Sequence, residues 1–371
     1  MTTPTLLASI VSLDDLRQGV DGGFIAVKPH PNGTTYLLNY TNRAQYASGW
    51  SHAVRVCRGL VVDRHPFEEG CVVLARPFAK FANVAEHSPT SPFGELPAGP
   101  FEVHEKLDGS LIIAFNAGNG PEFCTRGSFT SDQAVAASKL WQERYADVAW
   151  PVGVTWLFEY VAPWNRIVVS YDQEELVMIG AIDIATGADV AVGPEWPGPR
   201  ARVFDGFSDF DQVVAHMKEA DTDDAEGFVV RYVPTDPTGH SHRAKIKYAE
   251  YLRVHRLVTG VSTLTIWENL SSGQNFDELL DRVPDEFYDF VTTTVKHLSA
   301  QHDELLARAA EVAKSVEGLS RKEAALIVTA QSEAAPGLVF GTLDQKDVSA
   351  MAWRLLRPEH ETPSSAGIAN D

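Results

Sequence analysis

The stretch FEVHEKLDGSLIIAF, residues 101–115, places one lysine between two apolar runs. Apolar residues alternate with polar ones before Lys106 and the run Leu111–Ile113 follows it, so we expect a strand on each side. Asp108-Gly109 is turn chemistry, because glycine accepts positive φ and aspartate caps its own turn. A solvated hairpin lysine would explain Lys106 equally well on this stretch alone. The rest of the sequence has to decide between the two.

The composition is that of an ordinary soluble protein. The 371 residues suffice for two domains, and 44% of them are hydrophobic. The first residues lack the basic start and apolar core of a signal peptide, and no apolar run approaches membrane-spanning length. The three cysteines show no C-x-x-C spacing, which favours a reducing compartment without structural zinc. We therefore expect a cytoplasmic protein with no membrane partner.

The net charge of −19 limits the ways in which the chain can bind a polyanion. Residues 1–256 hold 22 Lys+Arg and 32 Asp+Glu, which gives −10, and residues 257–371 hold 9 and 18, which gives −9. Neither part is basic, so broad electrostatic attraction to a polyanion is not expected. A partner has to be recognised by the chemistry of a local site.

Short β-branched or aromatic runs, separated by Gly, Pro and Asp, fill the first part of the chain, up to about residue 255. This is a sheet-rich α+β pattern. The expected strands include 59–63, 71–78, 155–160, 166–171, 176–184 and 227–232, and the expected helices are 131–146 and 208–220.

The later part of the chain has a helical pattern. The segment 285–315 carries its apolar residues at helical spacing. Two candidate capping boxes that open later helices follow, Ser320-x-x-Glu323 and Thr342-x-x-Gln345. We expect a small all-α domain over residues 256–358 and a disordered tail over 359–371.

Four further charged residues follow Lys106 along the chain. Glu159 lies inside an expected strand, Glu226 directly precedes another, and the sequence AKIKY places Lys245 and Lys247 two residues apart. On a strand these two lysines point to one face, where they repel each other unless an anion neutralises them. A solvated strand edge would also tolerate such a pair. Glu159 either lies on an exposed sheet face or lines a cleft that binds a divalent cation or a ribose hydroxyl.

These residue types form a coherent set for chemistry at phosphorus. A lysine attacks phosphorus only when deprotonated, and nearby cations lower its pKa toward that state. Carboxylates can hold Mg²⁺, which bridges phosphate oxygens, and paired lysines can stabilise charge on the phosphate under attack. The sequence contains no G-x-x-x-x-G-K-[ST], G-x-G-x-x-G or G-x-S-x-G motif, so other phosphate-binding and nucleophile signatures do not compete with this set.

Seven segments, taken together, resemble a known family. They are CRGLVVD (57–63), RPFAKFANVAEH (76–87), EKLDGSL (105–111), TRGS (125–128), FEYVAPWNRIVVSY (158–171), EGFVVRY (226–232) and AKIKYAEYLRVH (244–255). In order and approximate spacing they resemble the RNA ligase 1 family, typified by the T-even bacteriophage enzyme, within the covalent nucleotidyltransferase superfamily. The resemblance implies an antiparallel-sheet-rich adenylation domain over residues 1–255, followed by the helical domain. No functional motif is matched after residue 256.

The resemblance implies a role for each matching residue. Lys106 is the implied nucleophile that forms lysyl-AMP, and Lys245 and Lys247 are the implied catalytic pair at the α-phosphate. The residues implied to bind ATP are Lys106, Arg58, Lys80, Arg126, Glu159, Glu226 and Tyr40, and those implied to hold the metal are Glu226, Glu159 and Tyr251. Arg126 stands where the family has a lysine, so a planar guanidinium group replaces a compact ammonium group there. For both tyrosines an ordinary half-buried position is an open alternative.

The implied function is ATP-dependent joining of RNA ends that carry a 5′-phosphate and a 3′-hydroxyl, through lysyl-AMP and RNA-adenylate, with Mg²⁺ or Mn²⁺. RNA repair is the implied role, with tRNA as one candidate substrate, and we expect a monomer. DNA ligation and capping-type nucleotidyl transfer use the same chemistry and stay open. A non-catalytic RNA-end-binding protein is the alternative from another class, and the intact set of lysines and acids argues against it.

Overall fold

The computed structural model describes residues 4–47, 49–116, 118, 120–219, 225–234, 239–249, 251–252, 260–273, 287–330 and 335–359. The chain divides into two compact units, which comprise the described residues up to 252 and the described residues from 260 onward. The fold is mixed α/β, and of the strand pairs within its sheets only β13 with β5 is parallel in the described residues. No helix among these residues has the length and apolar character needed to cross a bilayer.

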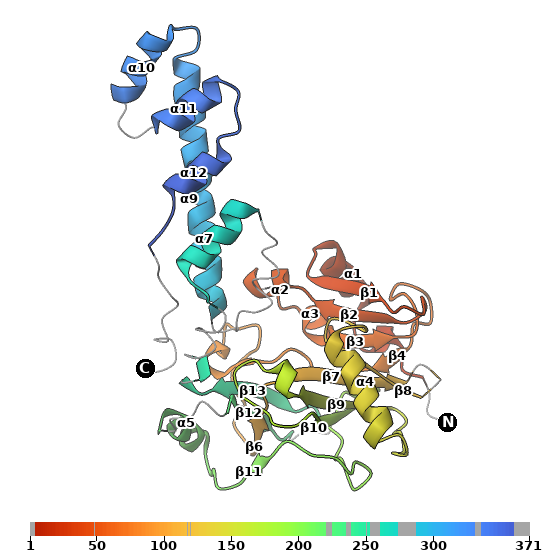
Figure 1. Ribbon diagram of the computed structural model, residues 1–371. Helices are drawn as coiled ribbons and strands as arrows, with labels where there is room; N and C mark the ends of the chain where they lie inside the picture. The colour runs from red at the N-terminus through yellow and green to blue at the C-terminus, as the bar shows by residue number, and fades with distance from the viewer. Residues whose placement is uncertain are drawn as a thin grey trace. The chain divides into compact units, whose positions relative to one another are not determined.

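The first sheet has the order β1-β2-β3-β4, and two helices cover one of its faces (Figure 1). Leu16 and Val54 of the helices share a buried cluster with Leu38 and Leu60 of the sheet. Ser12 is the N-cap of the helix that carries Leu16, and its side chain accepts a hydrogen bond from an amide of the first turn. The strands are β1 (Ile25–Pro29), β2 (Tyr36–Tyr40), β3 (Arg58–Val62) and β4 (Val73–Ala75), and the helices near them are α1 (Leu13–Asp21), α2 (Asn42–Tyr46) and α3 (His52–Val56), with a short 3₁₀ turn, η1 (Leu7–Ser9), before them.

The second sheet packs with one face on the first sheet and with the other on a helix. Ile113 and Leu157 join a cluster with Val61 of the first sheet, whereas Ile112 and Phe158 pack with helix residues on the opposite face. This alternation is the two-residue period of a strand buried on both faces. The order is β10 (Glu175–Asp183), β9 (Val154–Val161), β7 (Ser110–Asn116) and β8 (Pro121–Thr125), and the covering helix is α4 (Asp132–Arg144).

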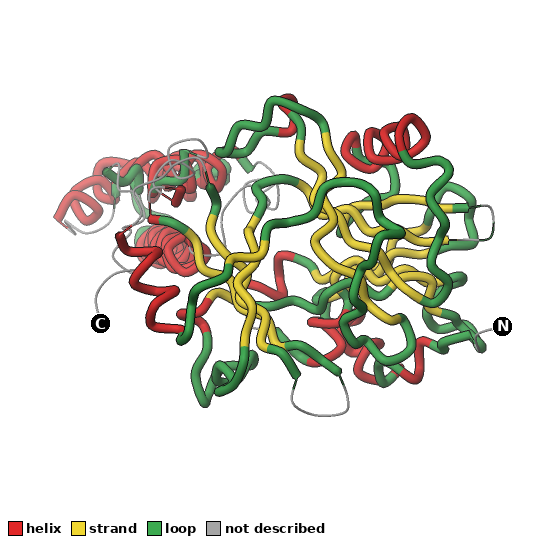
Figure 2. The backbone as a smooth tube through the Cα atoms, turned by 90° about the horizontal axis from the view of Figure 1, so that it is seen from below, coloured by secondary structure: helices red, strands yellow, loops and turns green. Residues whose placement is uncertain are grey.

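The third sheet has one apolar and one charged face. Val103, Val230 and Ala244 lie opposite one another and are buried. The residues next to them in sequence point to the other side and are mostly charged. Its order is β11 (Val203–Phe204), β6 (Phe101–Lys106), β12 (Gly227–Tyr232), β13 (His242–Lys247) and β5 (Ala82–Asn83), with α5 (Phe210–Glu219) and the turn η2 (Val84–Glu86) beside it; Figure 2 shows the strands of all three sheets.

The two strands around Lys106 are present but do not form a hairpin. β6 ends at Lys106 and belongs to the third sheet, whereas β7 begins at Ser110 and belongs to the second. The hairpin interpretation is therefore wrong. Residues 107–109 instead carry the chain from one sheet to another, which places Lys106 at the junction between them.

The other predicted elements of this unit are largely confirmed. The predicted strands 59–63, 155–160, 176–184 and 227–232 and both predicted helices are present, and the predicted strand 71–78 shortens to β4. The predicted strand 166–171 is wrong, because after the 3₁₀ turn η3 (Pro163–Asn165) the chain runs as a loop to residue 174.

Every regular element in the described part of the second unit is a helix. Val312, Val328 and Leu338 are buried in a core that this unit forms by itself. The helices are α7 (Thr263–Ser272), α9 (Tyr288–Ser315), α10 (Arg321–Ala330), α11 (Pro336–Leu343) and α12 (Ser349–Leu355). The predicted boundary at 255/256 and nearly all of the predicted tail lie outside the described residues. An independent helical domain stays a prediction.

One of the two predicted capping boxes is confirmed. The Ser320 amide donates to the Glu323 carboxylate at 3.0 Å, and α10 follows. The other is wrong, because Thr342 lies in the last turn of α11 and its hydroxyl donates to the Leu338 carbonyl at 2.9 Å. Gln345 sits at φ 56°, where the chain leaves that helix.

Candidate active site

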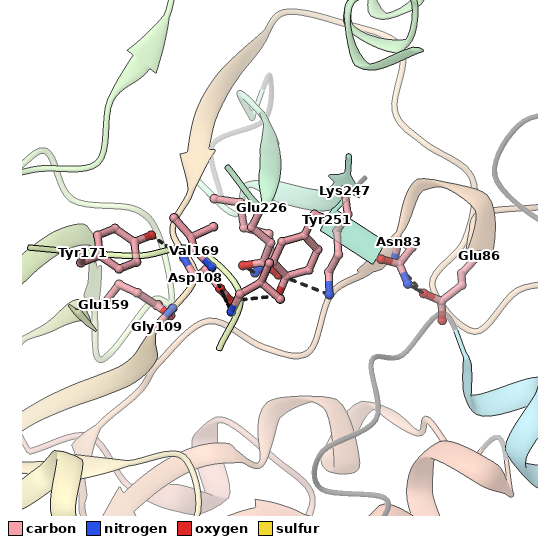
Figure 3. Close-up of polar contacts among 12 residues, drawn as sticks. Asn83, Glu86, Asp108, Gly109, Glu159, Val169, Tyr171, Glu226, Lys247 and Tyr251 are labelled. Carbon is pink, nitrogen blue, oxygen red and sulfur yellow. Dashed lines mark hydrogen bonds and ion pairs between the residues drawn. The ribbon is translucent and has the colours of Figure 1, made fainter. Parts of the chain in front are cut away.

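Lys106 and Lys247 face each other across the third sheet and share one carboxylate. Both pair in register with Gly227 on the strand between them. Glu226, which directly precedes that glycine, has Oε2 2.5 Å from Lys106 Nζ and Oε1 3.2 Å from Lys247 Nζ. The Lys247 and Glu226 side chains are only 8% and 5% exposed. Figure 3 shows Glu226 and Lys247 together near the end of the sheet. The solvated alternatives are therefore wrong for both lysines.

Gly227 permits this arrangement. Its φ is +150°, and a Cβ built there would lie 2.1 Å from the Ile246 carbonyl oxygen. Any side chain would push β12 away from β13. The strand pairing that sets Lys106 opposite Lys247 therefore requires glycine at this position.

The charge on Glu226 is fixed by its neighbours. Burial alone would raise the pKa of this carboxyl, but the ammonium groups of Lys106 and Lys247 outweigh burial and hold its pKa below the usual range. The charge of Lys245, on the same face of β13, also lowers the pKa of Glu226. Glu226 is therefore ionised at neutral pH and serves as the counter-ion that the paired lysines need.

Glu159 has the opposite electrostatic character. Burial raises its pKa to about 7, although the Lys106 ammonium lowers it, and the Glu226 carboxylate adds to the increase. Its Oε1 accepts a hydrogen bond from the Gly109 amide at 3.2 Å. It lies on the same face of β9 as Leu157, the face that packs toward the first sheet. Glu159 therefore lines the junction between sheets and titrates near neutral pH.

Asp108 holds the segment that follows the lysine. Its Oδ2 accepts hydrogen bonds from the Val168 and Val169 amides at 2.7 and 2.8 Å, and its own amide donates to the Tyr171 hydroxyl at 2.9 Å (Figure 3). Its Oδ1 accepts a hydrogen bond from the Tyr251 hydroxyl at 2.8 Å. The side chain is 2% exposed. Asp108 thus ties two separate segments, the loop around residues 168–171 and Tyr251, to the turn.

Three of the remaining predicted residues form a cation–aromatic cluster. Lys80 Nζ lies 5.6 Å from the ring centre of Tyr40 and 5.2 Å from that of Trp50. The Arg126 guanidinium lies 4.6 Å from the Tyr40 ring centre and donates to its hydroxyl. Tyr40 is 5% exposed and packs edge-on against Trp50. Contacts with the Tyr40 and Trp50 rings position these cations, and a positioned cation can bind an anion.

Arg58 connects this cluster to the carboxylates. It opens β3, and its guanidinium lies 5.4 Å from the Phe81 ring centre and donates to the Phe78 carbonyl at 3.5 Å. Its charge lowers the pKa of Glu159, so the two groups lie within electrostatic reach. At the adjoining Gly59, a Cβ would lie 3.2 Å from the Arg126 Cα, which places the two arginine-bearing segments side by side.

Tyr251 is brought to the site, in a position that the sequence did not specify. The residue is 2% exposed, its hydroxyl proton is directed to Asp108, and the Lys247 ammonium lies 5.4 Å from its ring centre. These contacts make it a support for the turn. Its assignment as a metal ligand stays a prediction.

The residues fit a divalent cation that arrives with a phosphate ligand. No three His, Cys, Asp or Glu side chains gather into a metal site in the part of the chain that the structure describes. Mg²⁺ needs only one or two carboxylates when substrate phosphates complete its shell. Glu226 faces two ammonium groups, which would repel a cation, so Glu159 is the better candidate.

The sequence-based reasoning missed four contributors to the site. The sequence predicts a turn at Asp108 but no further role for it, and it gives no signal for Tyr171, Trp50 or the amides of residues 168–169. The buried aspartate inside K-x-D-G was the available signal, because a buried carboxylate must find donors. Nothing local indicates which distant amides supply them.

The comparisons with known proteins identify the family to which the chain belongs. A family model described as RNA ligase matches residues 56–251, and the chain belongs to this family. A curated protein of Thermovibrio ammonificans (strain DSM 15698 / JCM 12110 / HB-1), described as "Putative RNA ligase", is 25% identical over 233 residues, which cover 59% of this chain and 57% of that protein. The chain thus spans little more than half the length of this relative.

The solved structures with which the chain aligns include two forms of an archaeal ATP-dependent RNA ligase. Form 2 aligns with a TM-score of 0.46 at 14% identity and covers 75% of this chain and 70% of that one. Form 1 aligns with a TM-score of 0.44 at 14% identity and covers 86% of each chain. Naegleria gruberi RNA ligase with PPi aligns with a TM-score of 0.30 at 14% identity, over 42% of this chain and 51% of that one.

Proposed function

We propose that this protein is an ATP-dependent RNA ligase that joins a 5′-phosphate to a 3′-hydroxyl through an adenylate on Lys106. The observation that carries the proposal is the sharing of Glu226 by Lys106 and Lys247, which face each other across Gly227. A lysine held at a sheet junction, next to a second cation and with a fixed counter-ion, suits attack on a phosphate ester. Membership of the RNA ligase family supports RNA as the substrate.

In the first step the Lys106 amine attacks the α-phosphorus of ATP. A P–N bond forms, the bond from the α-phosphorus to the bridging oxygen breaks, pyrophosphate leaves, and the lysine loses its protons to solvent or to a carboxylate. Lys106 must be neutral to attack.

The other cations suit the remaining charges of the substrate. Lys245 and Lys247 share one face of β13, from which they can stabilise negative charge that develops on the α-phosphate. Arg58, Lys80 and Arg126 can bind the triphosphate or the RNA end, with Tyr40 holding two of these cations in place. We assign each of these roles by chemistry and position.

A divalent cation, Mg²⁺ or Mn²⁺, would neutralise phosphate charge when bound, and Glu159 would hold it. Because the pKa of Glu159 is raised to about 7, this ligand loses its proton only near neutral pH. We expect nucleotide transfer to weaken as the pH falls below 7.

The second and third steps complete the ligation. The AMP moves from Lys106 to the 5′-phosphate of RNA, which forms a pyrophosphate linkage and returns the amine. A 3′-hydroxyl then attacks that 5′-phosphate, a phosphodiester forms and AMP leaves. RNA repair in the cytoplasm by a monomer, with nicked tRNA as one candidate substrate, remains part of the proposal.

The test is incubation with α-labelled ATP and Mg²⁺ followed by denaturing electrophoresis. Wild type should retain the label, and Lys106→Ala should not. Lys106→Arg should fail as well, because guanidinium keeps its proton. Label on the alanine variant would refute the nucleophile assignment. Labelling with GTP in preference to ATP would favour a capping-type enzyme, and sealing of DNA in preference to RNA would favour a DNA ligase.

A further inference from the structure

The loop from residue 162 to residue 171 is attached to the segment that carries the candidate nucleophile. The Val168 and Val169 amides donate to Asp108, two residues from Lys106 (Figure 3). From the other end of the loop, Asn165 Nδ2 donates to the Ser110 hydroxyl at 3.2 Å. Contacts on both sides of Gly109 therefore hold the loop in a fixed position beside the lysine.

Asn165 adds two further contacts. Its Nδ2 also donates to the Tyr160 carbonyl at 3.1 Å, and its Oδ1 accepts a hydrogen bond from Gln133 Nε2 at 3.1 Å. A loop fixed by this many polar contacts presents its exposed side chains in a defined orientation.

The same loop exposes two large apolar side chains. Trp164 is 53% exposed and Ile167 is 37% exposed. Trp164 is the one tryptophan among the strongly exposed large hydrophobic residues in the described part of the chain. Its ring centre lies 5.6 Å from that of the fully buried Tyr160, at a tilt of 50°. One side of the indole is therefore supported by the protein, and more than half of its surface faces solvent.

We propose that Trp164, which packs on Tyr160 on the α4 side of the second sheet, is a stacking platform for a base of the RNA near the ends that are being joined. The inference rests on the proposed function and adds to it the residue that holds the RNA. The chain carries a net charge of −19, so general attraction to phosphates cannot supply its affinity for RNA. Stacking on an aromatic face does not depend on charge and accepts every base.

The neighbouring Arg166 fits the same ligand. Its residue is exposed, and its Nε donates to the Val168 carbonyl at 3.0 Å, which directs the guanidinium along the loop. An exposed cation on the same loop as an exposed aromatic side chain matches a nucleotide, which offers both a base and a phosphate. A purely apolar partner would leave this charge uncompensated.

Direct binding of RNA provides the first test. Fluorescence anisotropy of a labelled 12-nucleotide single-stranded RNA is compared for wild type, Trp164→Ala, Trp164→Phe and Val152→Ala. Val152, which is 75% exposed and lies outside the loop, is the matched control. We expect Trp164→Ala to bind roughly 5- to 100-fold more weakly, Trp164→Phe to retain most of the affinity, and Val152→Ala to match wild type. Equal affinity of wild type and Trp164→Ala would overturn the inference.

Kinetics separate this inference from the proposed function. If the wild type forms no lysyl-AMP, the proposed function fails, while the binding comparison still decides the role of Trp164. If wild type seals RNA, Trp164→Ala should raise KM for RNA and lower the ratio of sealing to self-adenylation. A loss in kcat at unchanged KM would place Trp164 among residues that only support the fold and would also overturn the inference.

Discussion

At the scale of single residues, the pKa values of two glutamates, Glu159 within β9 and Glu226 directly before β12, shift in opposite directions. Glu226 stays ionised because two ammonium groups outweigh its burial, whereas the pKa of Glu159 rises to about 7 because burial outweighs one ammonium group. Pairs of acids whose environments separate their pKa values commonly divide the work of a site. Here Glu226 is suited to be a permanent counter-ion and Glu159 a ligand whose charge depends on pH.

Replacing Glu159 by glutamine should increase stability at high pH. Because the pKa is higher in the folded protein than the ordinary 4.5, folding becomes less favourable as the pH rises from about 4.5 to about 7, and this loss persists above pH 7. Glu159→Gln removes this loss of stability, and the glutamine side chain can still accept a hydrogen bond from the Gly109 amide. We expect the free energy of unfolding to rise by about 1–2 kcal/mol at pH 8 and by less at pH 5. The value at pH 8 is smaller than the full pKa shift implies, because solvent reaches part of the Glu159 side chain.

Urea unfolding at the two pH values measures this difference. The same variant should adenylate poorly, which would show that the acid costs stability and serves function. A variant no more stable than wild type at pH 8 would contradict the raised pKa of Glu159.

At the scale of elements, strands were predictable where side chains alternate, and segments held by distant partners were not. The strands that end in Lys106 and Lys247 follow from alternation and turn residues. The apolar run at 167–169 has the composition of a strand, but two of its amides donate to Asp108 and it does not join a sheet. Which amides a buried carboxylate recruits depends on tertiary structure, which no local pattern encodes.

The site could be predicted in composition but not in arrangement. Lys106, Glu226 and Lys247 were identified, and the register through Gly227 brings them together. The local turn signal suggested that the strands around Lys106 could pair with each other, but each joins another sheet instead. Pairing partners are decided by long-range contacts, and Asp-Gly is compatible with both outcomes.

The turn between β6 and β7 should not tolerate even one added carbon. A Cβ on Gly109 would lie 2.4 Å from the Tyr160 carbonyl oxygen, so β7 or β9 would have to move. We expect Gly109→Ala to lose about 1–3 kcal/mol in the free energy of unfolding and to self-adenylate poorly. Chemical denaturation and the labelling assay measure the two effects.

Gly127→Ala is the matched control for this change. A Cβ at Gly127 would have ordinary contact, 3.8 Å from the Asn39 side chain, and its φ lies outside the glycine-favouring region. The free energy of unfolding of Gly127→Ala should stay within about 0.5 kcal/mol of that of wild type. A Gly109→Ala protein as stable as this control would show that the close approach is not needed.

At the scale of the whole molecule, the predicted site residues all lie in the first unit. The second unit has its own buried core, around Val312 and Leu338, and its own capping box. Residues 257–371 carry nine basic and 18 acidic residues, so they cannot supply a large phosphate-binding surface. Adenylation should therefore depend on the first unit alone.

A protein truncated at Arg256 should still adenylate Lys106 at a rate within a few-fold of the full chain. Its sealing should become less selective between a nicked tRNA-like hairpin and an unstructured strand, because shape-dependent contacts would be lost. Labelling with ATP and sealing assays on both RNAs measure this, with circular dichroism to show that the truncated protein is folded. A folded truncated protein that cannot adenylate would show that the helical unit completes the nucleotide site.

The junction at Lys106 has a mechanical consequence. Lys106 and Lys247 belong to one hydrogen-bonded sheet, so their separation is set by strand pairing and changes little. Glu159 belongs to a different sheet, joined to Lys106 through the short crossing at residues 107–109. A small shear of one sheet against the other would therefore change the lysine–glutamate distance and leave the lysine–lysine distance constant. The two lysines therefore form the rigid part of the site. If the proposed function holds, the side that carries Glu159 can adjust to a nucleotide as it enters and to pyrophosphate as it leaves.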